Sequence, residues 1–541
     1  MPKANLKIAV TSLFAVSAAM GAMWGAAWSA PATTPQALAE AAFQAMGGDK
    51  LAGLKTLTFD ATLQQWDPGE SESVSAPLKP DWGKATLHGI RDFGRGLVHN
   101  DWVRPKASPG MRTYSETITP DAGYVTGIDG NGAVTRRATV VGGQSEHTMS
   151  GVRLATTLRE QERNSVIMVM HSHPDRISDY PAQTVGGRRY PAAQYRGDYG
   201  TFIVMFDPAT HLPAVVRTRD FDQYDGDSNY DEALSDWRDT GGVKLPHRAL
   251  YTLNGVKIFD VTVSEYTVNP SLATNAFAIP PALRGKAAKP APIGKVPYQW
   301  IIRRLSNGFY LDTDAVYSDE GDTLKLTDIG PNITMATGAS HNTLIVATDK
   351  YLVAFEAPID DGLSQWVINA AAEKYPGKPF RYVVLTHHHI DHTGGVRAYA
   401  AQGATFVVGK GDGAFWRKVL SAPDGLDPYP VKRSGAPKVI EVNGKWSIND
   451  GGREIDAYSL ENPHATGYLI PYVPDAKLGL VTDIWSPGRP MPPTADAGMI
   501  SVVKGVEKIG IKPERFAGGH GFVDNYSALV QLVQKTEAAA H

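Results

Sequence analysis

The sequence predicts a two-domain protein, in which a β-rich half is followed by a half of alternating strands and helices. The length of 541 residues exceeds that of one ordinary domain. Apolar and polar residues alternate with the period of strands up to about residue 270, and strand and helix patterns then take turns. A stretch rich in Pro, Ala and Lys at 281–297 separates the two patterns, and we interpret it as a linker.

Residues 36–280 are expected to form the first domain. A helix over 36–46 is predicted to stop at Gly47-Gly48. Leu57, Phe59, Ala61 and Leu63 alternate with polar residues, as in a half-buried strand. Residues 201–206 and 214–218 are apolar runs on either side of a turn, which predicts a hairpin. We therefore expect a curved antiparallel sheet, a half-barrel.

The first 30 residues are expected to be an export signal. Lys3 and Lys7 precede an uncharged run from Ile8 to Trp28, and Ala27-Trp28-Ser29 is a suitable cleavage site. The sequence thus predicts a periplasmic or secreted protein, attached to a membrane only if the signal is kept. The net charge of −3 gives no reason to expect a nucleic-acid partner. We expect the protein to bind a small-molecule substrate, and the sequence leaves its oligomeric state open.

Residues 298–541 are expected to form the second domain. Strands are predicted at 343–347 and 351–355, and a helix at 363–374. A buried strand at 382–385 is followed by a helix predicted from 393 to 402. In such α/β layers, sites form at the carboxyl ends of the strands.

The densest chemical motif follows that buried strand directly. His387, His389, Asp391 and His392 are four metal-capable side chains within six residues, in a chain with 15 histidines. Imidazole and carboxylate together suit zinc and its first-row neighbours. His387 and His389 can point the same way from an extended loop, while the next two residues enter a turn. One loop can therefore supply two adjacent metals, with His388 as support or packing.

More ligands are needed, and three candidates lie further along the chain. His464, Asp483 and His520 each follow a strand or sit in a glycine-rich turn, where the backbone lets a ligand approach a metal closely. The chain contains no cysteine, so neither a thiolate ligand nor a disulfide is available.

The order of these ligands, with Gly394-Gly395 behind the first cluster, resembles the metallo-β-lactamase superfamily over residues 298–541. The resemblance implies an αββα sandwich. It also implies that His387, His389 and His464 hold one metal, that Asp391, His392 and His520 hold the other, and that Asp483 bridges them. The bridging aspartate resembles the glyoxalase II and lactonase branches more than the β-lactamase branches.

This ligand set suggests a hydrolase with two Zn²⁺ ions, iron and manganese being alternatives. Two such ions hold a bridging hydroxide that attacks an ester, lactone, amide or related bond. Asp391 is the expected catalytic residue, because it is placed to ligate a metal and to orient the nucleophile or move its proton. The alternatives are a β-lactamase-like resistance enzyme, an iron-binding redox protein of the same fold, and an envelope ligand carrier.

Two features near the motif can be interpreted only with a structure. The family usually has Asp-x-Gly after the preceding strand, whereas this chain has Glu356-Ala357-Pro358, which questions how the ligands are supported. His341, Trp485 and Arg489 are further candidates for substrate contacts.

Outside the second domain, the chemistry-like motifs are expected to be structural. His171-Ser172-His173-Pro174 lacks the downstream residues of a JAMM-type metalloprotease, and 225–236 lacks the glycine and glutamate of a calcium loop. The first domain resembles the curved sheet of LolA/LolB lipoprotein carriers in its strands and turns. It is expected to cap the site, bind an apolar ligand or serve as a scaffold.

Overall fold

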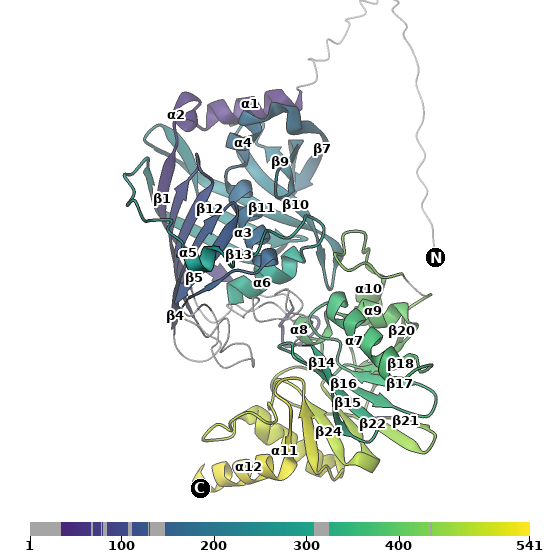
Figure 1. Cartoon of the computed structure of the whole chain (residues 1–541). Helices are drawn as coiled ribbons and strands as arrows, with labels where there is room; N and C mark the ends of the chain where they lie inside the picture. The colour runs from purple at the N-terminus through teal and green to yellow at the C-terminus, as the bar shows by residue number, and fades with distance from the viewer. Residues whose placement is uncertain are drawn as a thin grey trace, which may run out of the picture.

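The computed structural model describes residues 34–66, 69–76, 78, 84–105, 111–127, 129, 146–307, 324–432 and 435–540 (Figure 1). The predicted export signal lies outside these residues. Within them, no helix combines the length and apolarity needed to cross a membrane.

The first domain is built on a curved sheet of 13 antiparallel strands, as predicted. Its spatial order is β6-β5-β4-β3-β2-β1-β13-β12-β11-β10-β9-β8-β7. The strands are β1 Thr56–Gln65, β2 Ala85–Asp92, β3 Leu97–Pro105, β4 Met111–Thr119, β5 Ala122–Gly127, β6 Glu146–Thr148, β7 Ile177–Val185, β8 Arg188–Arg196, β9 Thr201–Phe206, β10 Pro213–Asp222, β11 Gly226–Thr240, β12 Val243–Leu253 and β13 Val256–Val268.

Helices cover one face of this sheet. They are α1 Pro35–Ala45, α2 Asp49–Ala52, α3 Gly151–Asn164 and α4 Val166–Ser172, with a 3₁₀ turn at Pro174–Arg176. Figure 1 shows α3 and α4 between β1 on one side and β9–β10 on the other. Phe43 of α1 and Met170 of α4 pack with Phe202 and Val216 of the sheet, which joins both helices to it in one core.

A largely apolar cavity of about 340 Å³ lies between the sheet and these helices. Leu57, Leu87, Trp102 and Ile167 are among the side chains that line it. The buried carboxyl of Glu232 also faces this cavity and accepts a hydrogen bond from the Tyr251 hydroxyl at 2.6 Å.

The segment expected to link the domains is partly helical. α5 Pro281–Arg284 contacts β5 and β6, and α6 Tyr298–Asn307 contacts α3 and β10. Gln299 Nε2 donates to Asp220 Oδ2 at 2.7 Å, which fastens α6 to the first domain. The first strand of the second domain that the structure describes, β14, begins at Lys325.

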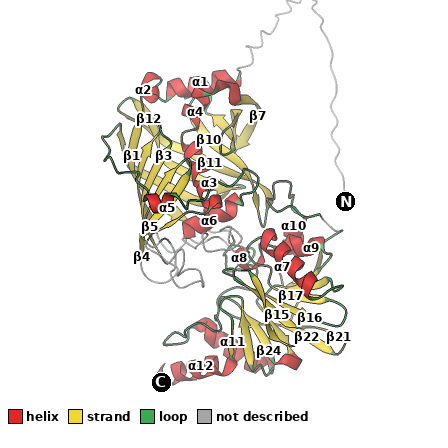
Figure 2. Ribbon diagram, viewed as in Figure 1, coloured by secondary structure: helices red, strands yellow, loops and turns green. Residues whose placement is uncertain are grey.

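The second domain consists of two stacked sheets with helices outside both, which confirms the expected αββα sandwich (Figure 2). The first sheet contains β14 Lys325–Gly330, β15 Ile333–Thr337, β16 Thr343–Ala347, β17 Leu352–Phe355, β18 Phe380–Val384, β19 Thr405–Gly409 and β20 Lys438–Val442, the last four running parallel. The second contains β21 Lys445–Asp450, β22 Arg453–Ser459, β23 Leu469–Val473, β24 Leu478–Val481, β25 Arg515–Gly518 and β26 Val523–Asn525.

Apolar side chains fill the space between and outside the two sheets. Val353 and Val384 meet Ile455 and Leu480 between them. The first sheet is covered by α7 Asp361–Lys374, α8 Ile390–Thr393, α9 Val396–Ala401 and α10 Gly413–Ser421. The second is covered by α11 Ala497–Ile509 and α12 Tyr526–Ala540.

The helix predicted over 393–402 is interrupted at two glycines. α8 ends at Thr393 and α9 begins at Val396. A Cβ on Gly395 would lie 2.2 Å from Ser364 Oγ and 2.4 Å from the Asp360 carbonyl oxygen. The Gly395 N–H donates instead to the Ala357 carbonyl at 2.9 Å. The two glycines therefore bring the metal-motif loop against the start of α7.

The turn between β10 and β11 joins the two domains. The Tyr224 hydroxyl donates to the His388 carbonyl, and its ring packs edge-on against Trp416 of α10. The buried guanidinium of Arg397 donates to the Gln223 carbonyl. Asp227 pairs through its backbone N–H with the Pro423 carbonyl at 2.8 Å. The acidic stretch that resembled a calcium loop is thus a contact between domains.

We predict that the stability of the first domain depends on pH because of Glu232. Burial raises the pKa of Glu232 to about 7, from 4.5. Folding therefore favours the protonated carboxyl, and this contribution is fully present below pH 4.5 and lost as the pH rises through about 7. Glu232→Gln should gain stability relative to wild type across that window, by on the order of 3 kcal/mol.

Urea unfolding monitored between pH 4.5 and 8 checks this prediction. Glu265→Gln, an exposed change on β13, is the matched control and should follow wild type at every pH. A difference between Glu232→Gln and wild type that does not change with pH would contradict it.

Candidate metal centre

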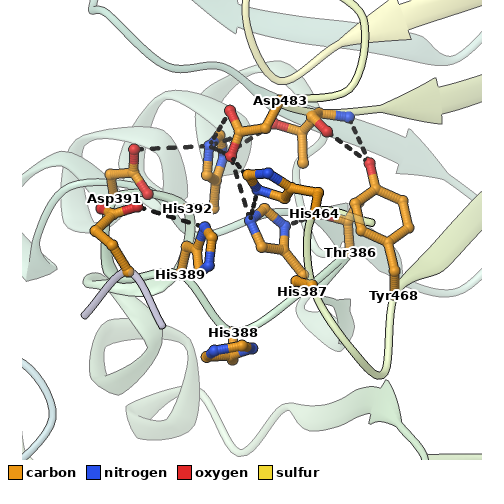
Figure 3. Close-up of polar contacts among 12 residues, drawn as sticks. Thr386, His387, His388, His389, Asp391, His392, His464, Tyr468 and Asp483 are labelled. Atoms are coloured by element: carbon orange, nitrogen blue, oxygen red, sulfur yellow. Dashed lines mark hydrogen bonds and ion pairs between the residues drawn. The ribbon is translucent and has the colours of Figure 1, made fainter. Parts of the chain in front are cut away.

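The predicted ligands come together at one edge of the sandwich, although they arise from both sheets. The motif loop follows β18, His464 lies between β22 and β23, Asp483 follows β24, and His520 lies between β25 and β26. Leu469 N–H donates to the Thr386 carbonyl at 2.7 Å, which joins the loops of the two sheets. Figure 3 shows the side chains converging on Asp483.

The first group of donors contains His387, His389, His464 and Asp483, with one ligand atom from each lying within 4.8 Å of the others. His387 Nε2, His464 Nε2 and Asp483 Oδ2 form a triangle with all three sides at 3.2 Å. Two ligands of one tetrahedral zinc lie about 3.3 Å apart when each bond is about 2.0–2.1 Å long. The triangle therefore matches one face of such a coordination sphere.

The second group contains His341, Asp391, His392 and His520 within the same limit. His341 Nε2 lies 3.1 Å from Asp391 Oδ2, and His392 Nε2 lies 3.8 Å from that oxygen. Asp483 also reaches this group, because its Oδ1 lies 2.8 Å from His520 Nε2 and 3.1 Å from His392 Nε2. One carboxylate thus contacts both groups. Its Oδ2 lies 3.2 Å from His387 and His464 of the first group and 3.0 Å from His392 of the second, which Oδ1 also meets.

The structure places His341 among the donors of the second group, where its ring is buried. The substrate contact that the sequence predicted for it stays a prediction. Ser340 Oγ, 2.7 Å from His341 Nδ1, fixes the orientation of the ring. The residue comes from the connection between β15 and β16, far from the motif in sequence. No spacing rule could have identified it.

Most of the histidines use Nδ1 to fix the ring and turn Nε2 inward. His387 Nδ1 meets Thr386 Oγ1 at 3.0 Å, and His520 Nδ1 meets the Ser340 carbonyl at 3.2 Å. Such contacts set the tautomer and the direction of metal-binding histidines. The donors are therefore held in place by the protein itself.

Glu356 supplies the support that the missing Asp-x-Gly motif put in question. Its side chain is fully buried, and Oε1 accepts the Thr386 N–H at 2.7 Å. Oε2 lies 3.2 Å from His392 Nδ1. The residue adopts a φ of 70°, which turns the carboxylate under the motif loop. A carboxylate behind a metal-binding histidine raises the basicity of the ring and orients it.

Charge and burial tune the centre for cations. Burial and repulsion from neighbouring imidazoles hold the pKa of His387 well below its ordinary value and lower that of His389, so both rings keep a lone pair for a metal. Burial opposes ionisation of Asp483, but His392 and its other histidine partners hold the pKa of this carboxyl well below its usual range. Burial likewise opposes protonation of His392, yet the carboxylates of Asp483 and Asp391 raise its pKa well above the ordinary value.

Metal ions and protons compete for imidazole and carboxylate donors of this kind. The fit to metal rests on the donor types and on the 3.2 Å triangle: imidazoles and a carboxylate held at the separation of ligands on one ion.

The other sequence candidates lie elsewhere. His388 points away from both groups (Figure 3), and its Nε2 meets the Ser71 carbonyl at 2.9 Å. Trp485 is 2% exposed and packs against Phe516 in the core, so its placement gives no support for a substrate contact. The contact of Arg489 with substrate stays a prediction. His171 stacks on Phe43 at 3.6 Å, a packing role.

The fold and the donors define a two-sheet metal-binding domain of the metallo-β-lactamase type. Residues 347–484 match the family model of the metallo-beta-lactamase superfamily. This part of the chain belongs to that superfamily. Curated proteins give no match to the sequence.

Several solved structures are similar to part of this chain at low identity. A metallo-beta-lactamase from Pontibacter korlensis is 16% identical, with 40% of this chain and 99% of that chain covered and a TM-score of 0.32. The sec-alkylsulfatase Pisa1 from Pseudomonas sp. is 17% identical, covering 44% and 42%, with a TM-score of 0.29. The Flv1 flavodiiron core from Synechocystis sp. PCC6803 is 14% identical, covering 40% and 61%, with a TM-score of 0.32.

We predict that Glu356→Gln weakens metal binding in the second group selectively. The amide oxygen can still accept the Thr386 N–H, but an amide N–H₂ would then face His392 Nδ1 in place of a carboxylate oxygen. Loss of such a partner costs about 10–100-fold in metal affinity. Chelator competition should show one weakened ion and one unchanged ion.

Glu454→Gln, a half-exposed position on β22, serves as the control for this change and should bind both ions as wild type does. Equal affinities in Glu356→Gln and wild type would show that the carboxylate does not support the ligand.

Proposed function

We propose that this protein is a dinuclear metal-dependent hydrolase, with zinc as its metal. The observation that carries the proposal is the position of Asp483, whose carboxylate lies within 3.2 Å of histidines from two separate groups of donors. Two divalent ions bound there would activate a shared water and polarise the oxygen of the bond to be cleaved. Zinc fits the donors, which are imidazole and carboxylate in a chain without cysteine.

In this proposal, Asp391 holds both a ligand role and a proton role. Its Oδ2 lies within the second group, 3.1 Å from His341 Nε2. His341 keeps this oxygen turned toward His392, so Asp391 Oδ1 is the atom that orients the attacking water and accepts its proton. Both side chains are buried, which excludes bulk water from this transfer.

The chemistry of the centre limits the substrate only to a broad group of classes. A carbonyl, phosphoryl or sulfuryl oxygen can each be polarised by the same pair of ions. A panel of esters, lactones, β-lactams, thioesters, phosphodiesters and sulfate esters, tested with the zinc-loaded protein, separates these classes. A colourless protein with two equivalents of zinc supports the proposal over an iron-binding redox protein of the same fold.

We also propose that the protein works after export, to the periplasm or the medium. Support comes from Lys3, Lys7 and the uncharged run that follows them. N-terminal sequencing of the protein from culture fractions tests this. A chain that keeps Met1 and stays in the cytoplasm would contradict it.

We predict that His389→Ala removes hydrolysis together with one metal ion. His389 is 4% exposed and lies in the first donor group. The wild type should bind about two equivalents of metal, and the variant about one. The loss in kcat/KM should exceed about 100-fold, the upper range for a change in a residue that only supports a ligand.

His171→Ala, remote from the centre, is the matched control and should keep both ions and full activity. Elemental analysis and steady-state kinetics on the best substrate of the panel provide the measurements. A folded wild-type protein that binds no metal would refute the proposed function.

A further inference from the structure

Two buried polar groups of the first domain face its cavity with hydrogen-bonding capacity that the fold does not use. Glu232 and Tyr230 both line the cavity, and each side chain is 2% exposed. Glu232 Oε1 accepts the Tyr251 hydroxyl at 2.6 Å. Within the part of the chain that the structure describes, no hydrogen bond reaches Glu232 Oε2 or the Tyr230 hydroxyl. Because buried polar groups nearly always have a partner, a molecule inside the cavity is the natural source of the missing one.

The two groups lie on one part of the cavity wall. Tyr230 and Glu232 are two residues apart on β11, so their side chains stand on the same face of the sheet. Tyr251 is opposite Glu232 in the register of β11 and β12, and its ring stacks with that of Tyr230, with centroids 5.6 Å apart. The carboxyl and the two phenols therefore form one polar patch on an otherwise apolar wall.

The rest of the cavity fits an apolar chain of moderate length. Leu57, Leu87, Leu245 and Val261 are among the side chains around it. Its volume of about 340 Å³ falls within the range of small-molecule sites, about 300–1,000 Å³. It corresponds to about 11 water molecules of about 30 Å³ each. Since a methylene group is about as large as a water molecule, a chain of about ten carbons with one polar group fits.

The charges beside the polar patch disfavour an ionic ligand. The buried guanidinium of Arg163 donates to Thr218 Oγ1 at 2.6 Å and to the Val216 carbonyl at 3.2 Å, and its Nε lies 3.3 Å from the Glu160 carboxylate. This cation is already paired, so it does not attract an anion into the cavity. A ligand cation would add a second buried positive charge close to it, because the guanidinium lies 4.3 Å from the centroid of the Tyr230 ring.

A neutral hydroxyl group meets the needs of the patch without adding charge. Burial raises the pKa of Glu232 to about 7, so its carboxyl is available both as an acceptor and as a donor near neutral pH. The Tyr230 phenol also donates and accepts. A hydroxyl has both capacities as well, so one such group can pair with Glu232 Oε2 and with Tyr230.

We propose that this cavity binds a neutral apolar molecule of medium length that carries a hydroxyl group, with Glu232 and Tyr230 holding the hydroxyl. The site goes beyond the proposed hydrolysis and does not depend on it. Among the described residues, those that line the cavity include none of the metal donors. The first domain is then a binding domain in its own right, attached to a metal-dependent one.

Three probes of equal chain length test the ligand class with the full-length wild-type protein. 1-Decanol, decanoate and decylamine are titrated separately at pH 7 by calorimetry, below the concentrations at which they aggregate. Decanol should bind at one site per chain and at least about 10-fold more tightly than either ion, because an ion would leave water without an unpaired counter-charge. Absence of decanol binding, or tighter binding of decanoate or decylamine, would overturn the proposal.

Tyr230→Phe tests the placement of the hydroxyl. It keeps the ring and removes one hydrogen-bonding group, so decanol affinity should fall about 3–10-fold. Tyr190→Phe makes the same chemical change on β8 at a residue that does not line the cavity, and it should bind decanol as wild type does. Equal decanol affinity in Tyr230→Phe and wild type would contradict the assignment.

Ala249→Trp tests whether the probes enter the cavity at all. Ala249 lies on the cavity wall in β12, so the larger side chain should fill the space and abolish binding of decanol. Circular dichroism and urea unfolding establish that the variant is folded. A folded variant that binds decanol with wild-type affinity would place the ligand elsewhere and overturn the proposal. If the variant does not fold, the titrations of wild type and Tyr230→Phe decide.

Discussion

The structure depends on one buried carboxylate that two sets of donors share. Asp483 follows β24 with a φ of 60°, a conformation that costs free energy for a non-glycine residue. The Tyr468 hydroxyl holds both backbone polar groups of the adjacent Thr482, because it accepts from the N–H and donates to the carbonyl. Because the backbone is fixed in this way, the carboxylate of Asp483 lies within 3.2 Å of histidines from both groups. The remaining ligands are arranged around this position.

The first domain takes part in the centre and does more than cover it. Tyr224 and the Ser71 carbonyl both contact the motif loop, the first at the His388 carbonyl and the second at two histidine rings. An unsatisfied buried N–H costs about 1–3 kcal/mol, so removing these partners would disturb the loop itself. The orientation of His389 is thus set by a residue more than 300 positions away in sequence. The second domain alone therefore does not contain all the groups that orient the donors.

Features that depend on local spacing could be predicted from the sequence, and features that depend on distant pairing could not. The dense His and Asp motif, the strand before it and the later His464, Asp483 and His520 are each readable from neighbouring residues. His341 precedes β16 and Glu356 follows β17. Both residues reach the motif only because β17 lies beside β18 in the folded sheet and β16 lies beside β17. The break at Gly395 follows from its close approach to α7, which no helix pattern contains.

The order of the donors along the chain has a consequence for how the protein acquires its metal. The centre contains His341 near the middle of the chain and His520 close to its end, and both belong to the second group. A nascent chain that has not yet reached His520 therefore lacks one donor of the second group. Because metal binding is coupled to folding, an ion bound there would come from the free metal pool of the compartment in which the chain folds.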